Sequence, residues 1–194
     1  MNSIVAAKGS ILQYAEEQGI EMADVFAQNV SVIVIVDTSS SMIARDARGG
    51  KMSRLQAATE ELAALQGRYP GQVALIAFND EVIACPSGIL PQAAGTTDVA
   101  SALQFAREFD VPGMTFVLIS DGEPNNSVSA IEQASMFNTP IHTIYVGGDD
   151  HGQRFLAQIA NATHGATSIA ELTEGLAQIV ESRMLTTREA NSPQ

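Results

Sequence analysis

Two carboxylates and three hydroxyl groups are spaced along the chain so that they could bind a divalent cation. Asp37 follows five consecutive β-branched residues, Val32–Val36, which predict a strand buried on both faces. Ser39 and Ser41 alternate with Asp37, so a short extended or turning segment would direct all three side chains to one point. One carboxylate and two hydroxyls suit a hard, oxygen-binding cation such as Mg²⁺.

A second carboxylate and the third hydroxyl occupy comparable positions. Asp121 comes shortly after another apolar run, Met114–Ile119, and Thr97 lies between the two runs in Gly95–Asp98, at the start of a predicted helix. Ligands bind at the carboxyl ends of parallel strands where the winding of an open sheet reverses. If the two strands are neighbours, all three loops surround one crevice. The protein would then supply too few oxygens to fill the coordination shell and would leave a position open for an outside ligand.

Strands and helices alternate along the chain. This order predicts an α/β fold: a doubly wound, Rossmann-like, mainly parallel sheet of about six strands, with one antiparallel strand and helices on both faces. The predicted strands are 32–37, 72–78, 81–85, 114–119, 141–146 and 165–168. The short turn at 79–80 permits only antiparallel pairing of its two strands. Predicted helices span 2–18 and begin near 53, 97, 129, 150 and 168, whereas 20–29 carries no clear pattern.

Length and composition predict one domain without a nucleic-acid or membrane partner. The 194 residues divide into an N-terminal helix and lead-in (1–29), a domain (30–182) and a flexible tail (183–194). Ten Lys and Arg against 22 Asp and Glu give a net charge of −12, with no basic run to neutralise phosphates. The single cysteine excludes an internal disulfide. No signal peptide or membrane span is recognisable, so we expect a cytoplasmic protein.

Three pieces of the sequence together resemble the metal-ion-dependent adhesion site (MIDAS) of a von Willebrand factor type A (vWA) domain. The pieces are Asp37-x-Ser39-x-Ser41, then Gly95-Thr96-Thr97-Asp98, then Leu118-Ile119-Ser120-Asp121-Gly122. Each stands in the family's order at the end of the expected element, and the resemblance covers about residues 30–182. An Asp-x-Ser-x-Ser segment alone would be weak, because turns and helix caps are rich in Asp and Ser.

The resemblance implies a ligand set and a function. Metal ligands would be Asp37, Ser39, Ser41, Thr97 and Asp121, holding Mg²⁺, or alternatively Mn²⁺ or Ca²⁺. The family often has Gly-Gly before its threonine, so Thr96 is an alternative ligand here, although Asp98 and the helix register favour Thr97. A partner protein's Asp or Glu would complete the shell. Stand-alone bacterial or phage-type members often work with AAA-type ATPases or stress-resistance assemblies.

The main rival is a metal-dependent phosphatase of the haloacid dehalogenase type. Its pattern has an Asp after the first strand, a Ser after a later strand and acidic residues after another, and the corresponding residues here are Asp37, Ser120 and Asp149-Asp150. That chemistry uses a lysine or arginine between the serine and the late acidic pair, and 122–148 contains neither. No Gly-x4-Gly-Lys-Ser/Thr follows any strand, which argues against a P-loop nucleotide site. We therefore expect a binding module and not an enzyme.

Overall fold

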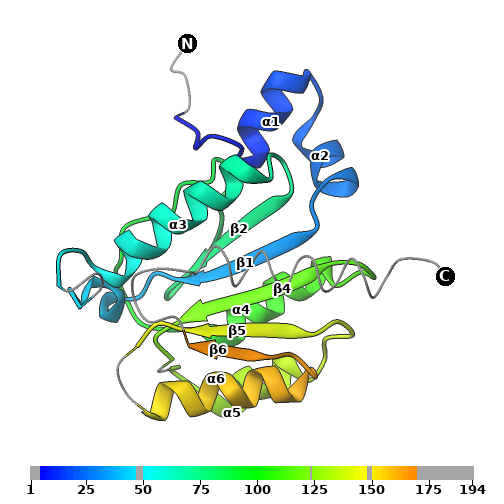
Figure 1. Cartoon of the computed structure of the whole chain (residues 1–194). Helices are drawn as coiled ribbons and strands as arrows, with labels where there is room; N and C mark the ends of the chain where they lie inside the picture. The colour runs from blue at the N-terminus through cyan, green and yellow to red at the C-terminus, as the bar shows by residue number, and fades with distance from the viewer. Residues whose placement is uncertain (1–4, 47–49, 123, 148–149, 170–194) are drawn as a thin grey trace.

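A single mixed sheet forms the centre of the molecule. The structure is a computed structural model that describes residues 5–46, 50–122, 124–147 and 150–169. The six strands lie in the order β3-β2-β1-β4-β5-β6 (Figure 1), and every neighbouring pair is parallel except the antiparallel pair β2–β3. The strands are β1 (Val32–Asp37), β2 (Val73–Phe78), β3 (Val82–Ala84), β4 (Thr115–Ser120), β5 (Ile141–Tyr145) and β6 (Thr167–Ile169).

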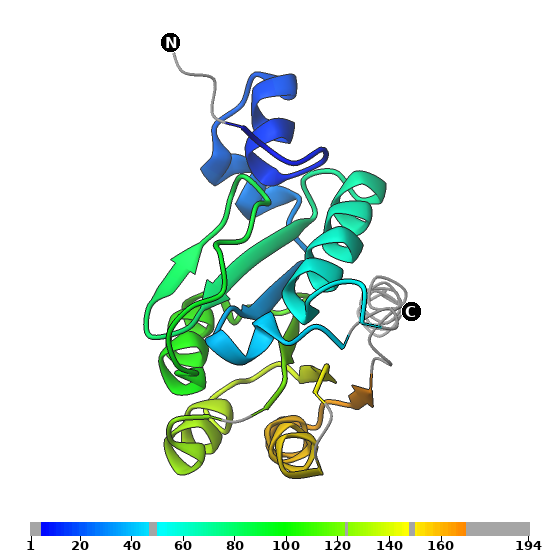
Figure 2. The same cartoon turned by 90° about the vertical axis from the view of Figure 1, so that its left-hand side faces the viewer.

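Helices cover both faces of this sheet, so the predicted fold class is confirmed (Figures 1 and 2). The helix α3 packs on one face, and α4, α5 and α6 pack on the other. The helices are α1 (Ile11–Gln18), α2 (Met22–Gln28), α3 (Arg54–Arg68), α4 (Val99–Ala106), α5 (Ser127–Ala134) and α6 (Asp150–Ala162), with 3-10 turns η1 (Ser40–Ile43) and η2 (Arg107–Phe109). None of the described helices is long and apolar enough to cross a bilayer.

The strand β1 divides the hydrophobic core into two layers. All six of its residues are buried. Its two isoleucines pack with the side chains of α4, α5 and α6, whereas its three valines pack with those of α3. Successive side chains of a strand point to opposite faces, so a run of β-branched residues fills both layers at once.

The winding of the sheet reverses between β1 and β4. From β1 the chain proceeds to β2 and β3 on one side, while β4, β5 and β6 extend the sheet on the other. Both neighbours of β1 run parallel to it, with Val36 opposite Ala77 of β2 and Ile119 of β4. The loops that leave β1 and β4 therefore emerge at the same edge, at the switch point where this class of sheet binds ligands.

The N-terminal helix is shorter than the predicted 2–18. It begins at Ile11, because Gly9 has a left-handed backbone (φ 77°) and the Ser10 hydroxyl accepts a hydrogen bond from a backbone N–H of the first turn. These two residues start the helix within the stretch whose apolar spacing had predicted a longer one. Gly19 ends the helix as predicted, with φ 67°.

Three further helix predictions differ from the structure or fall outside the described residues. Residues 20–29, for which no element was predicted, contain α2. The N-cap of α5 is Asn126, whose side chain accepts from the Ser129 N–H, so Ser129 lies in the first turn and does not cap the helix. Ser168, the predicted cap of the last helix, lies in β6, so that helix does not begin there; the rest of its predicted span and the tail from 183 lie outside the described residues.

Candidate functional site at the switch point

Asp37 is a fully buried carboxylate at the end of β1. Its Oδ1 accepts the Ser39 backbone N–H at 2.8 Å, and its Oδ2 accepts the Ser120 hydroxyl at 2.6 Å. Burial raises the pKa of Asp37 to about 6, and the negative charge of Asp121 adds to the shift, while the hydrogen bonds from Ser120 and Ser39 oppose it. The site therefore holds a carboxylate that a nearby cation would keep ionised.

The two serines of the Asp37 loop lie side by side. The hydroxyl oxygens of Ser39 and Ser41 are 3.0 Å apart. Ser39 is buried and stands at the N-cap position of η1, whereas Ser41 is exposed inside that turn. The tight 3-10 turn thus presents one sheltered and one accessible hydroxyl at the same place.

Backbone hydrogen bonds join the three loops at this edge. The Ala94 N–H donates to the Thr38 carbonyl at 2.9 Å, and the Ser40 N–H donates to the Gly95 carbonyl at 3.1 Å. Thr97 is linked in turn to the loop after β4, through hydrogen bonds with Asn125. The three loops that carry the predicted ligands are therefore joined to one another at this edge of the sheet.

The structure distinguishes the two threonines by what their hydroxyls contact. The Thr96 hydroxyl donates to the Asp80 carboxylate and accepts from the Asn125 side-chain amide at 2.8 Å. Thr97 is buried, and its hydroxyl makes no hydrogen bond with another described residue. Thr97 is consequently the better candidate for a ligand, and Thr96 serves to hold the loop.

Asp121 follows β4 directly and is paired with an arginine. Its Oδ2 accepts Nη1 of Arg54 at 2.9 Å, and its side chain is only 5% exposed. The same guanidinium donates through Nε and Nη2 to Asp46, with the shortest contact at 2.6 Å. Hydrogen bonds from Arg54 lower the pKa of Asp46. Sequence analysis missed this arginine, because it lies 67 residues from Asp121 and no motif contains it.

Several solved structures have a fold similar to that of this chain. BatB from Bacteroides thetaiotaomicron matches with a TM-score of 0.60 and 21% identity over 84% of this chain and all of its own. A von Willebrand factor type A protein from Catenulispora acidiphila has a TM-score of 0.55 and 19% identity, over 82% of this chain and 42% of its own. The VWA domain of SpRpn10 has a TM-score of 0.55 and 14% identity, over 79% of this chain and 95% of its own. The chain has a vWA fold.

This result confirms the fold implied by the sequence resemblance. No protein-family model matches the sequence, and no curated protein matches it either. At these low identities the likeness concerns the fold alone. The five predicted metal ligands of the vWA site therefore stay a prediction, and their support comes from the geometry of this chain.

The oxygen donors of the five predicted ligands would suit a small hard dication. Asp37 and Asp121 supply two carboxylates, and the three hydroxyls are neutral oxygen donors. Among the described residues, no group of three or more His, Cys, Asp or Glu side chains lies together as a metal site, so the predicted set has two carboxylates and otherwise relies on hydroxyl oxygens. The guanidinium of Arg54 already places one positive charge beside Asp121.

The late acidic pair, His142 and Cys85 are not among the five predicted ligands. Asp149 is outside the described residues, and Asp150 is the first residue of α6. His142 accepts the Ala166 N–H through Nδ1, 3.1 Å away, beside β6. Cys85 is buried, and burial raises the pKa of its thiol. None of these described groups joins the five predicted ligands.

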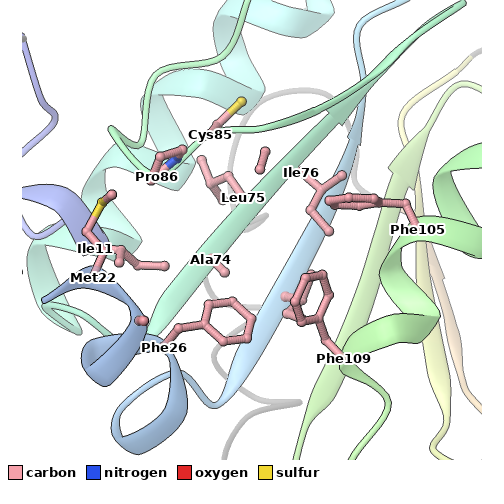
Figure 3. A pocket seen from close by; sticks show the side chains of 13 residues that line it. Ile11, Met22, Phe26, Ala74, Leu75, Ile76, Cys85, Pro86, Phe105 and Phe109 are labelled. Carbon is pink, nitrogen blue, oxygen red and sulfur yellow. The ribbon is translucent and has the colours of Figure 1, made fainter.

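An apolar pocket of about 200 Å³ lies beside β2, and its lining includes Ile33 of β1 but none of the five predicted ligands (Figure 3). Residues of α1, α2, β2 and the end of α4 line it, and the rings of Phe26 and Phe109 are 4.9 Å apart at its edge. Every lining side chain is apolar. The pocket offers no oxygen ligand and plays no part in the metal site.

Proposed function

We propose that this vWA domain is a protein-interaction module that binds an Asp or Glu side chain of a partner protein through a divalent cation. The supporting observation is that Asp37 and Asp121, from the two strands at the switch point, interact electrostatically at one edge of the sheet, where the Thr97 loop is hydrogen-bonded to the loop after β4. Mg²⁺ suits the oxygen donors best, with Mn²⁺ and Ca²⁺ as alternatives. We include in the proposal a partner of the AAA-type ATPase or stress-response class.

The chain's own residues have distinct roles in this proposal. Asp37 and Asp121 would hold the cation and balance its charge, while Ser39, Ser41 and Thr97 would add neutral ligands. The bound cation supplies a positive coordination position for an external carboxylate. Because the chain has a net charge of −12, the crevice without a cation repels an acidic partner. Binding of the partner should therefore depend on the cation.

The phosphatase alternative has no supporting observation. The Ser120 hydroxyl donates a hydrogen bond to Oδ2 of Asp37, and the Ser39 N–H donates one to Oδ1, so both oxygens of the carboxylate that would act as the nucleophile are engaged. No Lys or Arg occurs between residues 122 and 148 to hold a phosphoryl group. We therefore extend the proposal to a domain without hydrolase activity.

Selection of displayed random peptides tests the proposed function and does not require the natural partner. Peptides are bound to the immobilised chain in Mg²⁺ and eluted with EDTA. We expect the eluted peptides to share an acidic residue, and its replacement by Asn or Gln to abolish binding. Peptides that remain bound in EDTA, or that need no acidic residue, would show that recognition uses another surface and that the proposal is wrong.

Two threonine variants sharpen the same experiment. Thr97→Ala should weaken a selected peptide at least ten-fold and change the Mn²⁺ affinity less, since the family's threonine joins the metal shell when a partner is engaged. Thr96→Ala is the matched control, because it removes the same hydroxyl one residue away, where it contacts Asp80 and Asn125. This variant should lose stability by about 1 kcal/mol and keep peptide binding. Equal loss of peptide binding in both would contradict the assignment of Thr97.

A further inference from the structure

Arg54 is the first residue of α3, and its position is fixed from two sides. The fork of Nε and Nη2 pairs with Asp46, and Nη1 reaches Asp121 at 2.9 Å. The arginine side chain is 13% exposed, so most of it is withdrawn from water. A two-pronged pair with a carboxylate orients a guanidinium, and here it leaves the remaining nitrogen directed at Asp121.

The arginine and a divalent cation would satisfy the same buried charge. Asp121 is 5% exposed, and Arg54 is its only salt-bridge partner among the described residues. A carboxylate buried to this extent needs a counter-charge. Arginine stays protonated at any ordinary pH, so its positive charge cannot be removed when a cation arrives. The two positive charges repel each other at this short range.

Asp46 is a second ion-pair partner of Arg54. It lies on the loop before α3, its side chain is 42% exposed, and it holds two guanidinium nitrogens independently of Asp121. Arg54 can therefore give up its contact with Asp121 and remain paired. Because the guanidinium would stay paired with Asp46, an ion could displace it from Asp121 without leaving the arginine charge unpaired.

We propose that Arg54 is an internal cation that competes with the divalent ion for Asp121 and so raises the ion concentration at which the domain becomes able to bind its partner. This inference rests on the proposed function, because it assigns a regulator to the same metal site. It predicts two states of Asp121: paired with arginine at low ion concentration, and bound to the ion at high concentration.

Calorimetric titration with Mn²⁺ tests the competition. Arg54→Gln should bind Mn²⁺ at least ten-fold more tightly than the wild-type chain. Arg45→Gln is the matched control, because Arg45 carries the same charge on the loop that precedes α3 but is exposed and donates to the Lys51 carbonyl. Its affinity should stay within about two-fold of wild type if long-range charge matters little. Arg54→Met, which keeps the apolar stem, replaces Arg54→Gln if the latter fails to fold.

The outcomes separate the two claims. Unchanged or weaker Mn²⁺ binding by Arg54→Gln, in a wild-type chain that binds Mn²⁺, would overturn the competition and leave the proposed function standing. An equal gain in Arg45→Gln would also overturn it, as a general charge effect. Absence of Mn²⁺ binding in wild type and all variants would contradict the proposed function itself.

A measurement on the unmodified chain gives a second test. Nitrogen-15 NMR of the arginine side chains, recorded during Mg²⁺ addition, should show the Arg54 Nε–H resonance move while that of Arg45 stays in place. A stationary Arg54 resonance at Mg²⁺ concentrations that saturate the site would overturn the proposal.

Discussion

At the scale of single residues, Asp37 is the group whose environment most opposes its charge. It is fully buried, and two hydrogen bonds do not offset the loss of hydration, so its pKa rises to about 6. An isolated carboxyl in an unfolded chain titrates near 3.8. Between these two values the folded state without metal holds a proton that the unfolded state has released. Stability without metal must therefore fall as pH rises through this window.

This difference predicts a measurable pH dependence. In EDTA, the free energy of unfolding of the wild-type chain should fall by about 2 kcal/mol between pH 4 and pH 6.5, relative to Asp37→Asn, which cannot titrate. Urea denaturation of both proteins across this range measures the difference directly. Parallel curves for the two proteins would contradict the buried, raised-pKa state of Asp37.

At the scale of the elements, the sequence predicted the strands better than the helix ends. The run before Asp37 could only be a doubly buried strand, and β1 has the predicted bounds. Helix starts are less certain because several nearby residues can cap. Gly9 and Ser10 interrupt the N-terminal periodicity, and Asn126 precedes the predicted cap Ser129.

The candidate site was predictable only as far as its motifs extend. The five proposed ligands lie in short segments that follow strands or begin a helix, so local patterns reveal them. Arg54 and Asn125 contact the site from segments 67 and 28 residues away from their partners. Such contacts depend on how the helices and loops pack, which periodicity does not specify.

Gly122, which follows Asp121 after the end of β4, packs closely against α6. Its φ is 91°, and a Cβ there would lie against the backbone of Gly152 in α6. Gly113 has the same φ of 91° with open space around the Cβ position. Gly122→Ala should therefore destabilise the fold by about 2 kcal/mol more than Gly113→Ala, which carries only the backbone strain. Urea denaturation of both variants measures the difference, and equal losses would contradict the close packing of the β4–α5 loop on α6.

At the scale of the whole molecule, the sheet brings two distant segments together at one edge. The winding reverses between β1 and β4, which brings the ends of these two strands together. Asp37 accepts a hydrogen bond from Ser120, 83 residues away, and Asp121 follows Ser120 directly. Both carboxylates belong to an acidic chain, and Arg54 is the cation that the structure places between Asp121 and Asp46. Under the proposed function, a bound ion would offset these two carboxylates and offer a coordination position to an acidic partner.

The most direct test of the metal site is a calorimetric Mn²⁺ titration of the wild-type chain, Ser39→Ala and Ser40→Ala. Ser40 stands between the two proposed serine ligands, is exposed, and contributes to the loop through its backbone N–H, which alanine retains. We predict one Mn²⁺ per wild-type chain, unchanged affinity in Ser40→Ala, and at least ten-fold weaker binding in Ser39→Ala. No saturable binding by wild type, or equal affinity in Ser39→Ala, would contradict the proposed site.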